Sequence, residues 1–211
     1  MTAPDLAARL RAPDASSASP DDASLVARVR VGDESACEAL YLQHHQRLWK
    51  FAYGFVRSRD VAEEIVQEVF LSLWRGRREW DVRTNARAWL YAAVRHQALN
   101  HVRHERVVAR LVAPRADGVG EADAHAGIPL AMGDPPPDPD VSLERRELDD
   151  VVAREIARLP ERRRIAMTLR WKHDLSAAEI ARVLSTTPES VRVLLCRARQ
   201  DLAGLLAKLR G

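Results

Sequence analysis

Hydrophobic residues recur every three or four positions in two stretches of the chain, from Ser24 to Arg110 and from Ser142 to Leu209. This spacing places apolar side chains on one face of a helix, whereas a half-buried strand would alternate with a period of two. Both stretches are therefore predicted to be helical. Polar or glycine-containing breaks divide the first stretch into four helices, and they lie at 31–35, 57–60 and 76–85.

The second stretch contains the pattern of a helix-turn-helix. Its predicted helical segments cover about 143–159, 161–172, 177–184 and 188–209. Ser176 is followed three residues later by Glu179, which is the spacing of a capping box at a helix start. Thr187 before Pro188 repeats the start signal. The last two segments are therefore a short helix and a longer helix, joined by a tight turn.

The segment between the two stretches, Ala113 to Asp140, has a composition that does not favour packing. It holds six of the eleven prolines, and six acidic residues against one arginine. As a flexible tether of about 28 residues it has a root-mean-square span of roughly 30 Å. The predicted fold is all-α, with two small helical domains (23–112 and 142–211) joined by a flexible acidic linker (113–141). Residues 1–22, rich in Ala, Ser, Pro and Asp, are expected to form a disordered tail.

Charge is distributed unevenly, although the net charge of the 211 residues is only +3. From Pro160 to Gly211 there are eleven lysines and arginines against five acids. On the last predicted helix Arg192, Arg197 and Arg199 are spaced to address one DNA groove and its rims. The alternative is a solvated basic helix on a small bundle, which the cap, the turn and the preceding amphipathic helix make the less favoured interpretation.

Two uncharged residues, Val193 and Cys196, accompany the arginines of the last helix. Arginines supply affinity largely through phosphates, which carry no sequence information. Val193 and Cys196 are placed by helical spacing on the same side as Arg192 and Arg199, where they can approach thymine methyls or other apolar base edges. Cys196 is therefore interpreted as a small contact surface rather than a nucleophile, a metal ligand or a redox switch.

The end of the first stretch is also basic and carries aromatic residues. Between Arg75 and Arg110 there are nine arginines against three acids. The aromatic residues among them are Trp80, Trp89 and Tyr91. Arginines pair with phosphates and aromatic faces stack on unpaired bases, so the segment suits single-stranded nucleic acid. The alternative is that Trp89 belongs to the core together with Leu90 and Val94.

The helix predicted from Asp60 to Phe70 has an acidic face. Glu64, Gln67 and Glu68 share this face, while the apolar residues of the helix lie opposite. An acidic face disfavours nucleic acid and is free for a basic protein partner. Taken alone, the same pattern also fits an ordinary solvated surface.

Catalytic and metal-binding motifs are missing from the sequence. His96, His101 and His104 cluster on a predicted helix, but no carboxylate at ligand spacing accompanies them and HVRHE is not HExxH. A metal or hydrolase site is therefore the remote alternative, and we expect no enzyme activity, no cofactor and no metal. Cys37 and Cys196 form no CxxC pair, and neither a signal peptide nor an apolar run of roughly 20 residues is present. These features predict a soluble cytoplasmic protein.

Three segments, in this order, resemble the extracytoplasmic-function (ECF) sigma factors, the two-domain initiation subunits of bacterial RNA polymerase. DVAEEIVQEVFLSLW (60–74) resembles the polymerase-binding helix of region 2. ARAWLYAAVRHQALNHVR (86–103) resembles the promoter-melting helix. The segment from LPERRR to RARQDL (159–202) resembles region 4 with its helix-turn-helix. The resemblance extends from about residue 24 to residue 209.

The resemblance implies a role for each matching position. Residues implied in docking on the coiled coil of the largest polymerase subunit are Glu64, Gln67 and Glu68. Residues implied in minus-10 recognition, where the loop 80–85 captures a flipped base, are Trp80, Arg83, Thr84, Asn85, Arg87, Trp89, Arg95, His96, Asn100 and Arg103. Residues implied in reading the minus-35 duplex are Ser190, Arg192, Val193, Cys196, Arg197 and Arg199.

The resemblance implies core polymerase and promoter DNA as partners, with an anti-sigma factor as the further partner that is usual in the family. The linker would pass through the polymerase cleft toward the RNA exit channel. His96 and Asn100 stand where the family commonly has Asn and Asp, which puts base discrimination and melting strength at minus-10 in question. A helix-turn-helix regulator that acts without polymerase remains the alternative, and it would not need the acidic face.

Overall fold

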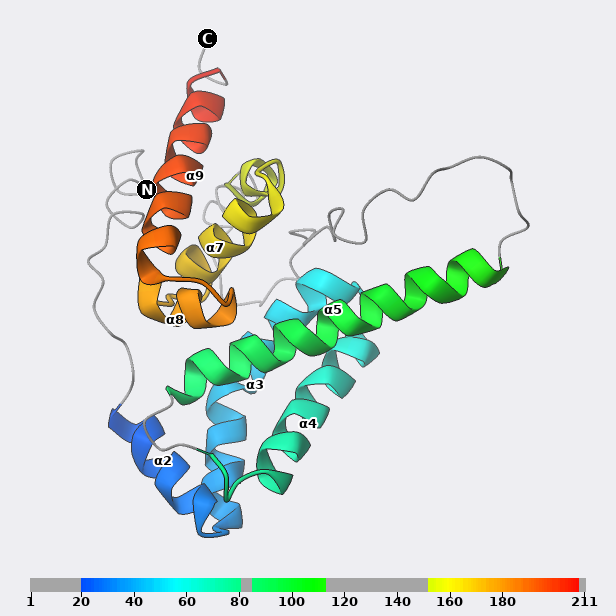
Figure 1. Ribbon diagram of the computed structural model, residues 1–211, viewed down its shortest axis with the longest axis vertical. Helices are drawn as coiled ribbons and strands as arrows, with labels where there is room; N and C mark the ends of the chain where they lie inside the picture. Colours follow the sequence, from blue (N-terminus) through cyan, green and yellow to red (C-terminus); the bar gives the residue numbers. More distant parts are fainter. Residues whose placement is uncertain (1–19, 81–84, 113–151, 209–211) are drawn as a thin grey trace, which may run out of the picture.

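The computed structural model describes residues 20–80, 85–112 and 152–208. Every regular element within these ranges is a helix (Figure 1). The helices are α2 (Pro20–Arg30), α3 (Glu34–Val56), α4 (Arg59–Arg75), α5 (Ala86–Val112), α7 (Glu161–Trp171), α8 (Ala177–Val183) and α9 (Pro188–Lys208). The four helices predicted for the first stretch and the last three predicted for the second are confirmed.

Two predicted segments fall partly or wholly outside the described residues. The first helical segment of the second stretch is described only from residue 152, and residues 152–157 are helical. The expected linker at 113–141 and residues 1–19 of the expected tail lie outside the described ranges.

Capping side chains set where several helices begin. The Asp33 carboxylate accepts a hydrogen bond from the Ala36 N–H at 3.1 Å, and the Ser58 hydroxyl accepts one from the N–H three residues on at 3.4 Å. Each satisfies a backbone donor that the first turn of a helix leaves free. The predicted capping box is confirmed, because the Ser176 hydroxyl accepts from the Glu179 N–H at 3.2 Å and the Glu179 carboxylate accepts from the Ser176 N–H at 2.7 Å.

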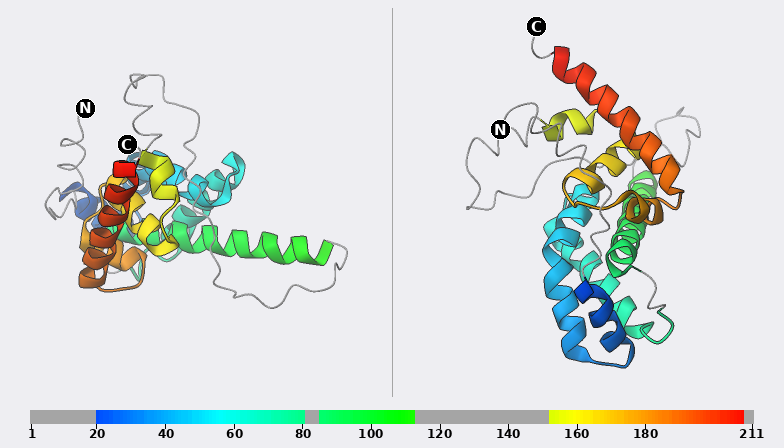
Figure 2. Two further views of the ribbon diagram at one scale, coloured as in Figure 1. Left: turned by 90° about the horizontal axis from the view of Figure 1, so that it is seen from above. Right: turned by 90° about the vertical axis from the view of Figure 1, so that its left-hand side faces the viewer.

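The first domain consists of α2 to α5 around one apolar core. Helix α3 contacts α2, α4 and α5, and Figure 2 shows it running alongside them. Its inward face carries Leu40, Leu48 and Phe51, all fully buried. Phe51 meets Tyr91 of α5 edge to face, with ring centroids 5.1 Å apart. Burial of each such side chain stabilises the fold by about 1.5–3 kcal/mol.

The first domain starts earlier than the sequence pattern indicated. The tail was expected to extend to Asp22, whereas α2 begins at Pro20. The Asp22 side chain is buried, accepts a hydrogen bond from the Gln43 amide at 2.7 Å and lies 3.2 Å from the His44 Nε2. These partners come from α3, about twenty residues away, so the local polar composition that suggested disorder was overridden by a tertiary contact.

The second domain packs α7 and α8 against α9. Its core includes Ile165, Leu169, Ile180 and Leu195. Between α8 and α9 the chain turns sharply, with Ser185 in the left-handed region at φ 51°. The order of short helix, tight turn and longer helix is that of the predicted helix-turn-helix.

The two domains touch through α5 and α8. In Figure 1, α8 lies beside the start of α5, the middle of α5 packs against α3 and α4, and its C-terminal part projects beyond the other helices. Side chains of residues 103–109 are all exposed along this projecting part. Within the described ranges, none of the helices has the length and apolar character to cross a membrane.

Candidate nucleic-acid interface and protein-docking surface

Helix α9 presents a mixed apolar and basic face to solvent. Val191, Leu195, Ala198 and Leu202 fill its buried side. The opposite side, which we call the α9 face, is made of five exposed residues: Ser190, Arg192, Val193, Cys196 and Arg197. At 100° per residue, positions 193 and 196 form the centre of this face and the two arginines flank it. A pair of small apolar side chains between two cations suits a DNA groove.

Polar contacts at the start of α9 order the edge of the α9 face. The Thr187 hydroxyl accepts from the Ser190 N–H at 3.2 Å, which confirms Thr187 as the cap. Arg192 donates to the Glu189 carboxylate at 3.3 Å. The backbone N–H of Glu189, with help from Thr187 and Arg192, holds the pKa of this carboxyl below its ordinary value. The acid remains ionised and orients Arg192 across the first turn.

Arg199 lies at one edge of the candidate minus-35 residues. Its side chain is half-buried, and its Nε is buried without a hydrogen-bond partner among the described residues. At 100° per residue it lies about 20° from Arg192 and about 60° from Cys196, but about 120° from Val193, next to the packed side. The helical spacing that groups Arg199 with Arg192 thus places it at the rim of the α9 face, and its partial burial agrees with that position.

The start of α5 gathers several candidate minus-10 residues, and the structure buries two of them. Trp80 is only 8% exposed and packs against Trp89 with ring centroids 5.3 Å apart. The Trp80 Nε1 has no partner among the described residues. The Trp80 ring therefore belongs to the core, and the base-capturing role that the resemblance implies for the loop 80–85 stays a prediction. Arg83 and Thr84 lie outside the described residues.

Asn85 and Arg87 face the second domain rather than solvent. The Asn85 side chain accepts from the Ala88 N–H at 3.0 Å, which caps α5, and donates to Glu179 at 3.1 Å. Arg87 is only 6% exposed and donates to the backbone carbonyl of His173. Both polar groups are engaged by a domain that lies more than eighty residues along the chain, which no local pattern could have indicated.

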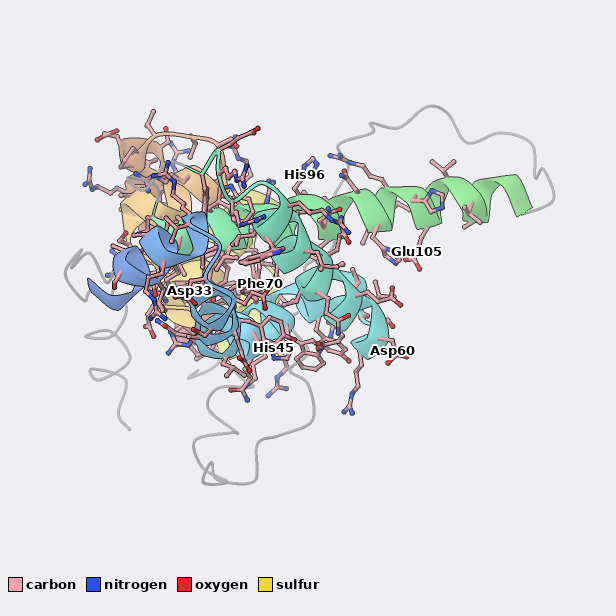
Figure 3. All side chains as sticks on the ribbon, turned by 90° about the horizontal axis from the view of Figure 1, so that it is seen from below. Asp33, His45, Asp60, Phe70, His96 and Glu105 are labelled. Atoms are coloured by element: carbon pink, nitrogen blue, oxygen red, sulfur yellow. The ribbon has the colours of Figure 1, made fainter. Side chains whose placement is uncertain are left out.

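Further along α5 the candidate residues form an exposed polar row. His96, Asn100 and Arg103 follow one another at i, i+4 and i+7, with the Asn100 amide 3.0 Å from the His96 ring and Arg103 3.4 Å from the Asn100 oxygen. Figure 3 labels His96 on this helix. Arg95 beside the row is partly buried, and burial lowers the pKa of its guanidinium. The row remains open for contact with a strand of nucleic acid.

Helix α4 bears the predicted acidic face. Glu64, Gln67 and Glu68 are all exposed. The Gln67 amide donates to Glu63 at 3.2 Å, and Glu68 accepts from Arg75 at 3.4 Å. The face is therefore preorganised by hydrogen bonds along the helix, but still open to solvent.

The acidic face borders a groove between α3 and α4 that the sequence pattern did not reveal. The groove is lined by Glu34, Cys37, Glu38, Tyr41, Gln67, Phe70, Leu71 and Trp74. Leu71 is 48% exposed and lines the groove together with Trp74. In the sequence, the signal for this groove was the pair Leu71 and Trp74, since they extend the apolar positions of α4 beyond its buried side. A groove with an apolar floor and an acidic rim suits a partner helix that carries both apolar and basic side chains.

The histidines of α5 do not assemble a metal site. His101 lies 3.4 Å from Glu105, and His96 pairs with Asn100 instead. Throughout the ranges that the structure describes, no three His, Cys, Asp or Glu side chains are placed to share a metal ion.

Comparison with known proteins identifies the family of the chain. The Sigma-70 region 2 family matches residues 40–107, and the Sigma-70 region 4 family matches residues 149–202. RNA polymerase sigma-H factor of Pseudomonas aeruginosa is 30% identical over 194 residues, covering 89% of this chain and 95% of that protein. ECF RNA polymerase sigma factor SigM of Mycobacterium tuberculosis is 29% identical over 188 residues, covering 89% and 86%. The chain belongs to the ECF sigma factors of RNA polymerase.

Further relatives of this sigma factor support the same family and fold. ECF RNA polymerase sigma-E factor of Escherichia coli is 29% identical over 181 residues, covering 86% of this chain and 92% of that protein. Among solved structures, CnrH in complex with the cytosolic domain of CnrY matches with a TM-score of 0.59 at 23% identity, covering 90% of this chain and 99% of that one. The sigma factor RpoE of Bartonella quintana, solved with the anti-sigma factor NepR, matches with a TM-score of 0.54 at 20% identity, covering 81% and 96%. The all-α fold and the family prediction are both confirmed.

Proposed function

We propose that this sigma factor reads the minus-35 element as duplex with the α9 face, contacts the separated minus-10 strand along α5, and docks on core polymerase through α4. The observation that carries the proposal is the separation of surface chemistry within one chain. A basic, apolar-centred face lies on α9, whereas an acidic face beside an apolar groove lies on α4. A DNA-binding regulator that works without polymerase has no need for the second surface.

Reading of the minus-35 duplex is assigned to the α9 face. Arg192 and Arg197 flank it and can reach guanine edges or phosphates. Val193, 49% exposed, and Cys196 at its centre can meet thymine methyls. Ser190 can contribute a hydroxyl at the N-terminal end of the helix, which points toward the groove in this type of motif. Arg199 at the rim is assigned to phosphate contact, which adds affinity rather than sequence discrimination.

Contact with the minus-10 strand is assigned to α5. The exposed row of His96, Asn100 and Arg103 offers a cation and two hydrogen-bonding side chains along one side of the helix. Trp89, half-buried beside Trp80, leaves part of its ring available for stacking on an unpaired base. Asn85 and Arg87 extend the same surface toward the helix start once the second domain moves away.

Docking on core polymerase is assigned to the acidic face of α4 and its groove. Glu64, Gln67 and Glu68 can pair with basic residues of a partner helix. Leu71 and Trp74 can receive its apolar side chains. The partner proposed from the family is the coiled coil of the largest polymerase subunit.

An anti-sigma factor is proposed as a further partner, because the related RpoE was solved with one. With core polymerase and promoter DNA as its other partners, the protein acts in the cytoplasm. It works as an initiation factor by binding, with no catalytic step, cofactor or metal of its own.

Run-off transcription with purified core polymerase tests the proposal. Promoter templates come from upstream regions of transcripts that increase when this chain is overexpressed. The charge-reversed variant E64K/E68K should lose core binding and run-off product, while its isolated-duplex binding through α9 persists. E79K/E105K, which makes the same change of charge at two exposed residues outside the groove, serves as the matched control for core binding. Unchanged core binding by E64K/E68K would favour the polymerase-independent regulator.

A further inference from the structure

A single carboxylate joins α3 to α4 beside the groove. Glu63 of α4 accepts a hydrogen bond from the Tyr41 hydroxyl at 3.2 Å, and its two oxygens lie 3.0 and 2.9 Å from the His45 Nε2. It also accepts one from the Gln67 amide, one turn further along α4, at 3.2 Å. Tyr41 and Gln67 line the groove, whereas Glu63 does not. Glu63 therefore stands behind the groove and holds side chains that a docked partner would meet.

The ionised state of Glu63 makes each of these neighbours a donor. Burial opposes ionisation of this carboxyl, but hydrogen bonds from His45, Gln67 and Tyr41 hold its pKa below its ordinary value. Burial, followed by the charge of Glu63, raises the pKa of the Tyr41 hydroxyl, which therefore stays protonated. An ionised carboxylate has no proton to donate, so every group bonded to it must donate.

This requirement fixes the direction of the Gln67 side chain. A glutamine amide carries a donor nitrogen and an acceptor oxygen on the same carbon, and it can bind a carboxylate only through the nitrogen. Because Glu63 holds the nitrogen of Gln67, the oxygen is the atom that faces a partner. Gln67 thus presents an acceptor beside the exposed carboxylates of Glu64 and Glu68. All three side chains of the acidic face offer acceptors.

We propose that Glu63 is a positioning residue of the docking surface, which turns the Gln67 carbonyl oxygen outward and so selects partner side chains that donate hydrogen bonds, such as lysine or arginine. This role rests on the proposed docking of core polymerase on α4. Glu63 acts through Gln67 and is not itself a contact residue. An outward amide nitrogen would set a donor against the donors of a cationic side chain, which disfavours that partner.

A role as a brace between helices is the competing explanation for Glu63. Tyr41 and His45 belong to α3, so removal of the carboxylate loosens the seam between α3 and α4 as well as the Gln67 amide. The two roles differ in one respect. A brace affects every contact of the docking surface, whereas an orienting residue has its effect only while Gln67 is present.

Side-chain NMR of the full-length chain tests the orientation in the absence of polymerase. E63M replaces the carboxylate with an unbranched apolar side chain, and E63Q keeps one carbonyl acceptor. The Gln67 side-chain amide protons, identified by their loss in Q67A, should exchange with water faster in E63M than in the parent, with E63Q between them. E105M, which removes a carboxylate 3.4 Å from His101 on α5, is the matched control and should leave the exchange unchanged. Parental exchange in E63M would overturn the proposal.

Binding to core polymerase tests the effect on docking. E63M should weaken this binding about three- to tenfold, because a side chain without its anchor must be ordered when the partner binds. E63Q should lie between E63M and the parent, and E105M should match the parent. In a Q67A background, E63M should cause no further loss. Equal losses from E63M with and without Gln67 would overturn the orienting role and leave Glu63 as a brace.

Two further measurements keep the outcomes distinct. Thermal unfolding shows whether E63M keeps a cooperative fold, and E63Q carries the comparison if it does not. E64K/E68K, measured in the same binding assay, separates failure of this proposal from failure of the proposed function. If E64K/E68K loses core binding while E63M and Q67A act independently, only the positioning role fails. If E64K/E68K retains core binding, the docking assignment fails, and the role of Glu63 in docking fails with it.

Discussion

The α9 face and the start of α5 were both predicted to contact nucleic acid because arginines cluster in their sequences, yet the two surfaces differ in exposure in the structure. On α9 the flanking cations Arg192 and Arg197 are exposed. At the start of α5, Arg87 is buried and bonded to the second domain. Similar local chemistry thus yields one surface that is available in the free protein and one that is not. Charge patterning therefore predicts what a helix can bind, whereas domain packing determines whether its side chains are exposed to bind it.

The largest expected effect is on the free energy of unfolding and concerns Trp80. It distinguishes a structural role of this residue from a role in contacting DNA. Because Trp80 is buried against Trp89, W80A should lower the free energy of unfolding by about 3 kcal/mol or more. Urea unfolding measures this loss. R103A, on the exposed row of the same surface, should stay within about 0.5 kcal/mol of the parent. A W80A chain with parental stability and weakened strand binding would restore Trp80 as an open base-capturing residue.

An intermediate effect is expected on α9. R192A should weaken binding to the minus-35 duplex by about 1–3 kcal/mol, since a bidentate contact to guanine is worth that much. Fluorescence anisotropy with the duplex isolated from responsive promoters measures the change. R182A, which removes an exposed arginine from α8 rather than from the α9 face, is the control. If R192A and R182A behave alike, Arg192 contributes only general charge.

The smallest effect per step concerns pH, and it accumulates over several pH units. Burial, with the nearby cations, lowers the pKa of His173 from 6.5 to about 3, so a chain in which this ring is exposed to solvent binds a proton more readily between these values. The stabilisation that the buried neutral ring provides is fully present above about pH 6.5. It should fall by about 1.4 kcal/mol for each pH unit below that, as the pH drops toward 3.

Scattering and amide exchange followed from pH 7.5 to pH 5 give the measurement for this dependence. The parent should expand as the pH falls, whereas H173A should show no dependence of this origin. A parent whose radius is constant over the range would contradict the role of a neutral His173.

Much of the fold followed from local signals in the sequence. The helix-turn-helix was predictable because Ser176, Glu179 and Thr187 satisfy backbone donors only a few residues away. The acidic face of α4 was predictable because a helix repeats with a fixed period. The beginning of α2 was not, since the burial of Asp22 depends on partners in α3.

The candidate site was predictable only in part. Spacing on α9 correctly put Val193 and Cys196 on the exposed side, but it could not show that the Arg199 Nε is buried without a hydrogen-bond partner among the described residues. The groove beside Gln67 also escaped prediction, because it forms only where α3 and α4 come together. Residues brought together by packing share no spacing along the chain.

Local sequence signals were enough to predict the helices, their caps, the two-domain organisation and the family, because these depend on short-range periodicity and on motifs of adjacent residues. Tertiary structure alone decided that Trp80 is core, that His173 enters the aromatic cluster of Phe51 and Tyr91, and that Asn85 and Arg87 are engaged. The physical reason is that burial and pairing of a polar group depend on which distant surface lies against it.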